Sequence, residues 1–173
     1  MPVEIVASEI LEDVHRLFAT RMRVKNIEFS LDVRAGIIFE AIKGEIRQVL
    51  INLIGNAIDA VQQHGAIHIE AKTIEREQPM VVIQVHDNGS GISAKQASQL
   101  FQPFFSTKGA HGTGLGLWVS RGIVEKHGGS LELASAPGPD GETRTTATIV
   151  LPVNANSELS LQVDQETQTP QKG

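Results

Sequence analysis

Three polar side chains recur along one predicted helix. Asn52, Asn56 and Asp59 stand at positions i, i+4 and i+7, which places them on one narrow stripe of an α-helix. Apolar residues fill the adjoining arc of the helix: Ile46, Val49, Leu50, Leu53, Ile54, Ala57 and Val61. A solvated face more often carries Lys and Glu, because Asn is a poor helix former. Since amide and carboxylate oxygens suit Mg²⁺, the stripe is either a solvated face or a candidate magnesium site.

A second candidate group is an aspartate at the end of a predicted strand. Asp87 alternates in phase with Ile83 and Val85, so its carboxylate points inward if those side chains face the core. An inward acid needs a hydrogen-bond donor, and an exocyclic amine such as that of adenine would serve. Gly89 and Gly91 follow at once and would let the backbone approach a flat ring closely. The alternative is an ordinary turn, because Asp-Asn-Gly is common turn chemistry.

A glycine-dense segment precedes another predicted helix. Glycines stand at positions 109, 112, 114 and 116, and helical spacing begins at Leu115. Free N–H groups and the positive end of the helix dipole would hold a phosphate there. Lys108 would add a point charge for a terminal phosphate. The alternatives are a flexible linker and an ordinary surface lysine, and the segment matches neither the P-loop nor the dinucleotide fingerprint.

Hydrophobic periodicity predicts the elements that must position these groups. Helices are expected at residues 3–23, 45–63, 93–101 (short) and 114–127. Strands are expected at 27–33 and 37–42, as a hairpin or two adjacent strands, and at 66–75, 80–87, 130–135 and 144–151. Because the elements alternate without a parallel βαβ rhythm, we predict a two-layer α/β sandwich, a mixed sheet covered on one face by helices.

Composition excludes several classes of function. The 173 residues fit one domain, and the net charge of −5 disfavours binding to nucleic acid. The chain has no cysteine, which excludes disulfides and thiolate zinc sites. Its six histidines form no helical i, i+4 pair and no cluster with acids, so a zinc site is not expected. No apolar run is long enough to span a bilayer, so no membrane contact is expected from this segment.

Four blocks taken in this order resemble the nucleotide-binding signature of sensor histidine kinases. Their superfamily also holds gyrase B, the heat-shock chaperone ATPases and the mismatch-repair clamp. Residues 52–60 resemble the N box, 87–91 the first glycine box, 103–108 the F box and 112–117 the second glycine box. Each block alone is degenerate, but all four at these spacings are highly specific. The resemblance covers roughly residues 25–152 and implies an α/β sandwich that binds ATP with Mg²⁺.

The resemblance also implies a role for each matched position. Asn56 is similar to the magnesium ligand, Asn52 to a second polar contact of the N box that could share the metal, and Asp87 to the acid that accepts a hydrogen bond from adenine. Lys108 is expected to join Asn52 and Asn56 in catalysis. The expected nucleotide-binding set is Asn56, Asp59, Asp87, Gly89, Gly91, Ile92, Lys108, Gly112, Thr113, Gly114, Leu115, Gly116 and Thr145. Gly112, Gly114 and Gly116 match a hinge that closes a lid over the phosphates. At Thr145 the chain departs from the pattern, with Arg144 in place of the usual Gly.

The larger departure lies upstream. Such kinases carry a phospho-accepting histidine on a helical hairpin, followed by an acid and a proline, whereas this chain offers only His15-Arg-Leu-Phe. We therefore expect residues 1–24 to be the end of that dimerisation hairpin and its linker, 25–152 the ATP-binding catalytic domain, and 153–173 a disordered tail or interdomain linker. The resemblance implies a homodimeric parent kinase that supplies the acceptor hairpin, a receiver domain of a response regulator downstream, and a cytoplasmic location whether or not the parent is anchored in a membrane.

Two other classes of protein are alternatives to a histidine kinase. An autonomous ATPase clamp, or a serine kinase of the anti-sigma type, has Glu at the position of Asn52, where a carboxylate can accept a proton. An amide has no useful basicity, so Asn52 favours a histidine kinase. A degenerate domain that only binds partners would be expected to lose some of the four blocks, and none is lost.

Overall fold

The structure, a computed structural model, describes residues 1–105 and 115–155. The helices are α1 (Ala7–Val24), α2 (Lys43–Ala60), α3 (Ala94–Ala97) and α4 (Gly116–Lys126). The strands are β1 (Val3–Val6), β2 (Glu28–Val33), β3 (Ile38–Ala41), β4 (Ala66–Glu75), β5 (Pro79–Asp87), β6 (Ser130–Pro137) and β7 (Thr143–Pro152). No helix in these two ranges combines the length and apolar character needed to cross a membrane.

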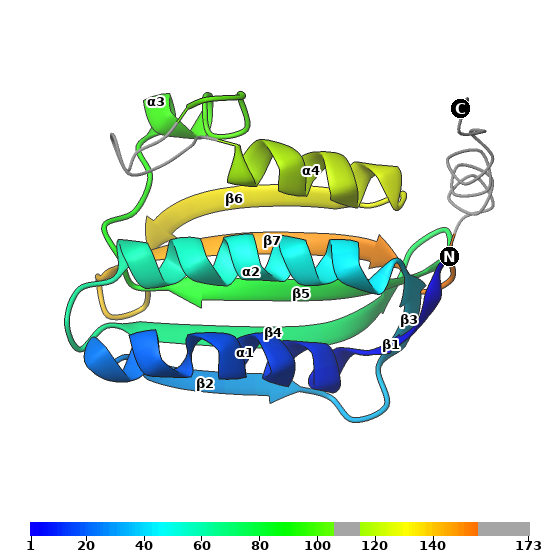
Figure 1. The fold of residues 1–173 in the computed structure, drawn as a ribbon. Coiled ribbons are helices and arrows are strands. Elements are labelled where there is room, and N and C mark those ends of the chain that lie inside the picture. The colour runs from blue at the N-terminus through cyan, green and yellow to red at the C-terminus, as the bar shows by residue number, and fades with distance from the viewer. Residues whose placement is uncertain (106–114, 156–173) are drawn as a thin grey trace, which may run out of the picture.

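The main sheet has five strands in the order β2-β4-β5-β7-β6. β2 runs parallel to β4 and the other pairs are antiparallel, so the sheet is mixed. α1, α2 and α4 lie side by side over one face of it (Figure 1). Alternate strand residues such as Ile69, Ile83 and Ile149 are buried against these helices, as the period of two requires. The predicted α/β sandwich with helices on one face is confirmed.

Two local predictions were wrong. The runs 27–33 and 37–42 do not pair with each other: β2 joins β4, and β3 pairs antiparallel with β1 in a separate two-stranded sheet. The helix expected from residue 3 begins at Ala7, because residues 3–6 form β1. Pairing with β3 buries Ile5 beside Phe39 and so stabilises the extended conformation of residues 3–6. This pairing is non-local, so the helical spacing of the sequence could not predict it.

The N-terminal segment shares one core with the rest of the structure. Buried residues of β1 and α1, among them Ile5, Ile10 and Val14, belong to the same apolar cluster as α2 and the sheet. Near the other end, Glu40 N–H donates to Val153 O over 2.8 Å, and Val153 N–H donates to Pro79 O over 3.0 Å. Residues 1–24 and 153–155 therefore pack onto the central unit, while their assignment to a hairpin end and to a tail stays a prediction.

The C-terminal end of α4 is fastened to the start of α2. His127 Nδ1 lies 2.8 Å from Ile123 O, and Ile42 N–H donates to His127 Nε2 over 3.2 Å. Lys126 forms an ion pair of 2.9 Å with Glu45. The chain then turns into β6 through Gly129, where an added Cβ would lie 2.0 Å from Val150 O. A glycine is therefore required at this close approach of two backbones.

Gly129→Ala should lower the free energy of unfolding by about 1–3 kcal/mol, because the backbone of β7 must move to admit a methyl group. Gly122→Ala is the matched control, since an added Cβ there meets nothing within 4 Å and the residue lies inside α4. This control should gain about 0.5–1 kcal/mol. Urea unfolding of both variants measures the difference, and equal stabilities would contradict the close approach at Gly129.

Candidate functional site

Three polar side chains form a row across the end of the sheet. Asp87 pairs with Thr145 in the β5–β7 register, and Thr145 pairs with Ser135 in the β6–β7 register. Each alternates in phase with core residues of its strand, so the row faces the helical layer. Ser135 Oγ and Thr145 Oγ1 lie 2.8 Å apart. The register of three strands thus gathers one carboxylate and two hydroxyl groups at one place.

Asp87 is buried, as its phase in the sequence predicted. Its exposed fraction is 7%, and Gly89 N–H donates to its Oδ1 over 2.8 Å. Desolvation raises the pKa of Asp87 from 3.8 to about 6, and the Gly89 hydrogen bond opposes that rise. A buried acceptor of this kind is suited to a ligand that brings an N–H group.

Glycines let the loop after β5 pack tightly against neighbouring elements. A Cβ on Gly89 would lie 2.5 Å from Ala60 O at the end of α2, and Ser90 N–H donates to that same oxygen over 3.2 Å. Gly91 has a φ of +78° and lies close to Thr143. The loop is therefore fixed between the end of α2 and β7.

Ser135 is a site residue that the sequence analysis missed. Besides its contact with Thr145, its Oγ accepts a hydrogen bond from Ile92 N–H over 2.9 Å. It thereby ties the loop that follows Gly91 to β6. A lone serine in a predicted strand carries no motif, and only its phase with Leu131 and Leu133 could have placed it on the helical side.

Asn52 joins α2 to the beginning of α4. Its Nδ2 donates to Gly116 O over 3.2 Å and to Ser120 Oγ over 3.0 Å, while its Oδ1 accepts from Gln48 Nε2 over 3.1 Å. Asn52 therefore positions the helix that follows the glycine-dense segment, a role that its place on the stripe did not predict. The Gln48 contact occupies one of the two lone pairs of Oδ1, and the predicted share of Asn52 in metal binding stays a prediction.

Some of the other predicted residues are described by the structure and some are not. Asn56 is half-buried one turn after Asn52, and Asp59 is exposed and forms an ion pair of 2.6 Å with Arg21 of α1. Leu115 and Gly116 form the start of α4. Lys108, Gly112, Thr113 and Gly114 lie outside the described residues. The structure thus gathers Asp87, Gly89, Gly91, Ile92 and Thr145 directly, and sets Asn52 and Gly116 at the neighbouring helix pair.

The donor set fits a nucleotide with its metal in chemical terms. Asp87 offers an acceptor for an amine, Thr145 and Ser135 offer hydroxyl groups, and Asn56 on α2 offers an amide oxygen of the kind that Mg²⁺ takes alongside water. The exocyclic amine of adenine would supply a donor to the desolvated Asp87 carboxylate in addition to Gly89 N–H.

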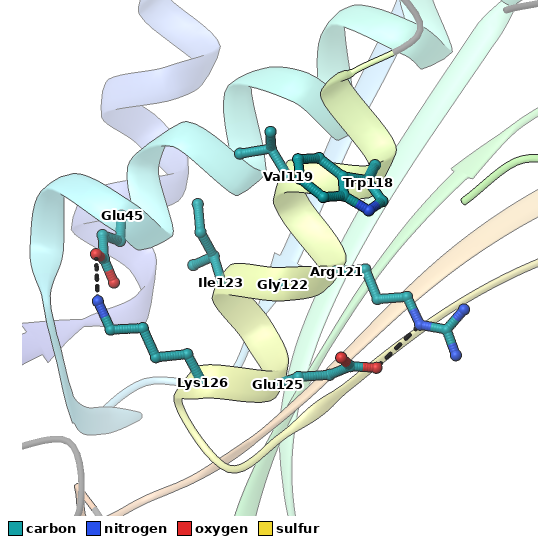
Figure 2. A pocket seen from close by; sticks show the side chains of 8 residues that line it. All are labelled: Glu45, Trp118, Val119, Arg121, Gly122, Ile123, Glu125 and Lys126. Carbon is teal, nitrogen blue, oxygen red and sulfur yellow. Dashed lines mark hydrogen bonds and ion pairs between the residues drawn. The ribbon is translucent and has the colours of Figure 1, made fainter. Parts of the chain in front are cut away.

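A separate hollow is lined by α4 and by the start of α2. Its lining includes Trp118, Val119 and Ile123 of α4 and Glu45 of α2, and Figure 2 shows the Glu45–Lys126 and Arg121–Glu125 ion pairs. Trp118 is half exposed there. Among the residues that the structure describes, none of those predicted to bind nucleotide lines this hollow.

Comparison with known proteins gives the same assignment for the greater part of the chain. Residues 42–155 match the family described as histidine kinase-, DNA gyrase B-, and HSP90-like ATPase. Sensor histidine kinase ZraS of Escherichia coli strain K12 is 47% identical over 109 residues, which are 63% of this chain and 22% of that protein. The chain spans about a fifth of the length of the curated relatives that it matches.

Solved structures agree with this match. The catalytic domain of histidine kinase ThkA, in a nucleotide-free form, superposes with a TM-score of 0.79 at 31% identity, over 89% of this chain and 97% of that one. Histidine kinase ThkA in complex with the response regulator protein TrrA gives a TM-score of 0.72 at 28% identity, over 88% of this chain and 42% of that one. The resemblance read from the four sequence blocks is therefore confirmed.

Asp87→Asn should stabilise the ligand-free protein at neutral pH. Because the folded pKa of about 6 lies above 3.8, the folded state binds more protons than the unfolded state between these values, so this group's contribution to stability falls as pH rises through that window. The Asn side chain cannot ionise, but its amide oxygen can still accept the hydrogen bond from Gly89 N–H. The variant should therefore gain on the order of 2 kcal/mol over the wild type between pH 4 and pH 7.

Urea unfolding at both pH values measures this gain. Glu77→Gln, in the exposed turn between β4 and β5, is the matched control and should show no such gain. A pH-independent difference between Asp87→Asn and the wild type would contradict the raised pKa.

Proposed function

Since this chain belongs to the histidine kinase-, DNA gyrase B-, and HSP90-like ATPase family, we propose that it binds ATP with Mg²⁺ and donates the γ-phosphoryl group to a histidine on a helical hairpin. The printed names of its relatives, sensor histidine kinases, support this choice within the family. The single observation that carries the proposal is the buried Asp87 carboxylate at the end of β5, beside Thr145 and the end of α2.

Adenine recognition rests on a carboxylate that can only accept. The exocyclic amine of adenine would donate to Asp87, whereas guanine presents a carbonyl oxygen at the corresponding position and would leave two acceptors facing each other. Gly89 lies against Ala60 O, where a Cβ would clash at 2.5 Å, so its N–H stays beside the Asp87 carboxylate. Ile92 supplies an apolar neighbour, and its N–H is held by Ser135.

The phosphate end is assigned to α2 and to the segment before α4. Asn56 would hold Mg²⁺, with Asn52 as a second amide, and the bound ion would neutralise charge on the phosphates. Lys108, Gly112, Thr113 and Gly114 are proposed as the cradle and lid for the phosphates. Asn52 also bonds Gly116 and Ser120 of α4. It would therefore link the proposed metal site to the helix that follows the proposed lid.

Asn52 also bears on the choice between kinase and ATPase. A group that activates water must accept a proton, and an amide cannot do so at neutral pH. Because a histidine acceptor brings its own nucleophilic ring nitrogen, this domain need only position the phosphates and the metal. An autonomous ATPase or an anti-sigma-type serine kinase is the second candidate, and it would require a base from elsewhere.

We propose a homodimeric parent kinase that carries the acceptor hairpin, a receiver domain of a response regulator as the next acceptor, and a cytoplasmic place for this domain. The complex of ThkA with its response regulator supports the receiver as a partner for this family.

ADP affinity should fall in Asp87→Asn by on the order of 1.5–3 kcal/mol, the range for a hydrogen bond to a charged group. Calorimetry with ADP and GDP measures it, and the wild type should prefer ADP. Since the same substitution is expected to stabilise the ligand-free fold, a loss of affinity cannot be ascribed to unfolding. Unchanged ADP affinity would remove Asp87 from the adenine site.

The chain alone should bind ATP, yet neither hydrolyse it appreciably nor label itself. None of its six histidines stands in the acceptor pattern: His15, His64, His68, His86, His111 and His127. Labelled ATP is supplied to the domain alone, and then with a hairpin added on a separate chain. Transfer to the histidine of the hairpin is expected only in the second case.

Asn56→Ala should abolish that transfer by removing a magnesium ligand. Asn154→Ala, an exposed amide beyond β7, is the matched control and should transfer normally. Rapid metal-dependent hydrolysis by the domain alone would favour the autonomous ATPase, and a stoichiometric acid-labile label on one of its own histidines would show that the acceptor was missed.

A further inference from the structure

The face of the sheet that points away from the helices carries a connected polar cluster. It draws on four adjacent strands through the pairs Ser30↔His68, His68↔His86 and His86↔Thr146. Asp32 and Glu70 are paired in the parallel register two residues further along β2 and β4. The positions of the histidines in the sequence predict no cluster with acids, and strand pairing overturns that prediction.

Three of these side chains present ligand atoms to one point. One carboxylate oxygen of Asp32, one ring nitrogen of His68 and one carboxylate oxygen of Glu70 all lie within 4.8 Å of one another. Asp32 is exposed, while His68 and Glu70 are half-buried, so an ion could enter from solvent. Two anionic oxygens and an imidazole at this spacing can close around one cation with little movement.

Hydrogen bonds outside this trio hold two of its members in place. Ser30 Oγ lies 2.6 Å from His68 Nδ1 and so fixes the orientation of the His68 ring. His86 Nε2 lies 3.0 Å from Glu70 Oε1, and Thr146 Oγ1 lies 2.7 Å from His86 Nδ1. With Thr146 donating to Nδ1, the Nε2–H of His86 donates to Glu70 Oε1 and orients that carboxylate. Such outer contacts orient ligands at many metal centres.

We propose that Asp32, His68 and Glu70 form a binding site for a divalent transition-metal ion of the Zn²⁺ class. An imidazole ligand favours Zn²⁺, Co²⁺ and Ni²⁺ over Mg²⁺ and Ca²⁺, which prefer oxygen alone. Three protein ligands leave a position for water. The site lies on the opposite face of the sheet from Asp87, so it is separate from the proposed nucleotide site and does not rest on it.

The position of the site suggests what a bound ion would change. β2 is an edge strand whose partner in the main sheet is β4, and Asp32 lies on β2 while His68 and Glu70 lie on β4. An ion shared by these residues links the edge strand to its neighbour by a side-chain bridge. Binding should therefore raise the melting temperature of the protein by several degrees at saturating metal.

Zn²⁺ is titrated into the metal-stripped, nucleotide-free chain by calorimetry, and Co²⁺ is added in parallel to record its visible absorption. One ion per chain is expected. Asp32→Asn, His68→Gln and Glu70→Gln should each weaken binding about 10-fold or more, and His86→Gln should weaken it about 10-fold through loss of orientation. Melting curves recorded in chelator test whether each variant is folded. Asp32→Asn changes an exposed side chain, so this variant is expected to fold as the wild type does.

His64→Asn is the matched control, because it removes an imidazole at a turn with a φ of +63° that Asn tolerates. It should keep the Zn²⁺ affinity, the Co²⁺ spectrum and the metal-dependent rise in melting temperature. The proposal is overturned if Zn²⁺ does not bind, or if Asp32→Asn and His68→Gln bind it as the wild type does.

Discussion

Burial of the Asp87 carboxylate at the end of β5 is the constraint around which the site is arranged. Desolvation raises its pKa to about 6, so keeping it ionised at neutral pH costs folding free energy that a donor from a ligand would offset. The surroundings serve to keep that carboxylate in place. Gly89 gives it a backbone N–H, and the loop is closed against Ala60 O at the end of α2. An N–H group of a ligand would join Gly89 N–H as a donor to this carboxylate.

α4 is held to α2 at both of its ends. At the start of α4, Asn52 bonds Gly116 O and Ser120 Oγ, and at its end, Ile42 N–H bonds His127 while Lys126 pairs with Glu45. A helix fixed at two points cannot rotate freely about its axis. Its first residue therefore gives the preceding glycine-dense segment a fixed endpoint beside α2.

Sequence reasoning predicted the layers, most of the strands and the inward phase of Asp87, because these depend on local periodicity. It failed where partner choice is non-local. Two alternating runs separated by three residues predict a hairpin or two adjacent strands, but β2 pairs with β4. β3 pairs with β1, in a segment for which the spacing predicts a helix. It also missed Ser135, whose role comes from the register of three strands, and the contacts of Asn52, which depend on how α4 docks.

Among the described residues, β2 and β6 form the two edges of the five-stranded sheet, and an edge strand must avoid pairing with another molecule. Along β2, Glu28 and Asp32 stand among the outward residues, and β6 carries Glu132 and ends at Pro137. Two copies brought edge to edge would set like charges against each other in a chain that already has a net charge of −5. The acidic residues on β2 therefore oppose growth of the sheet from one molecule into the next.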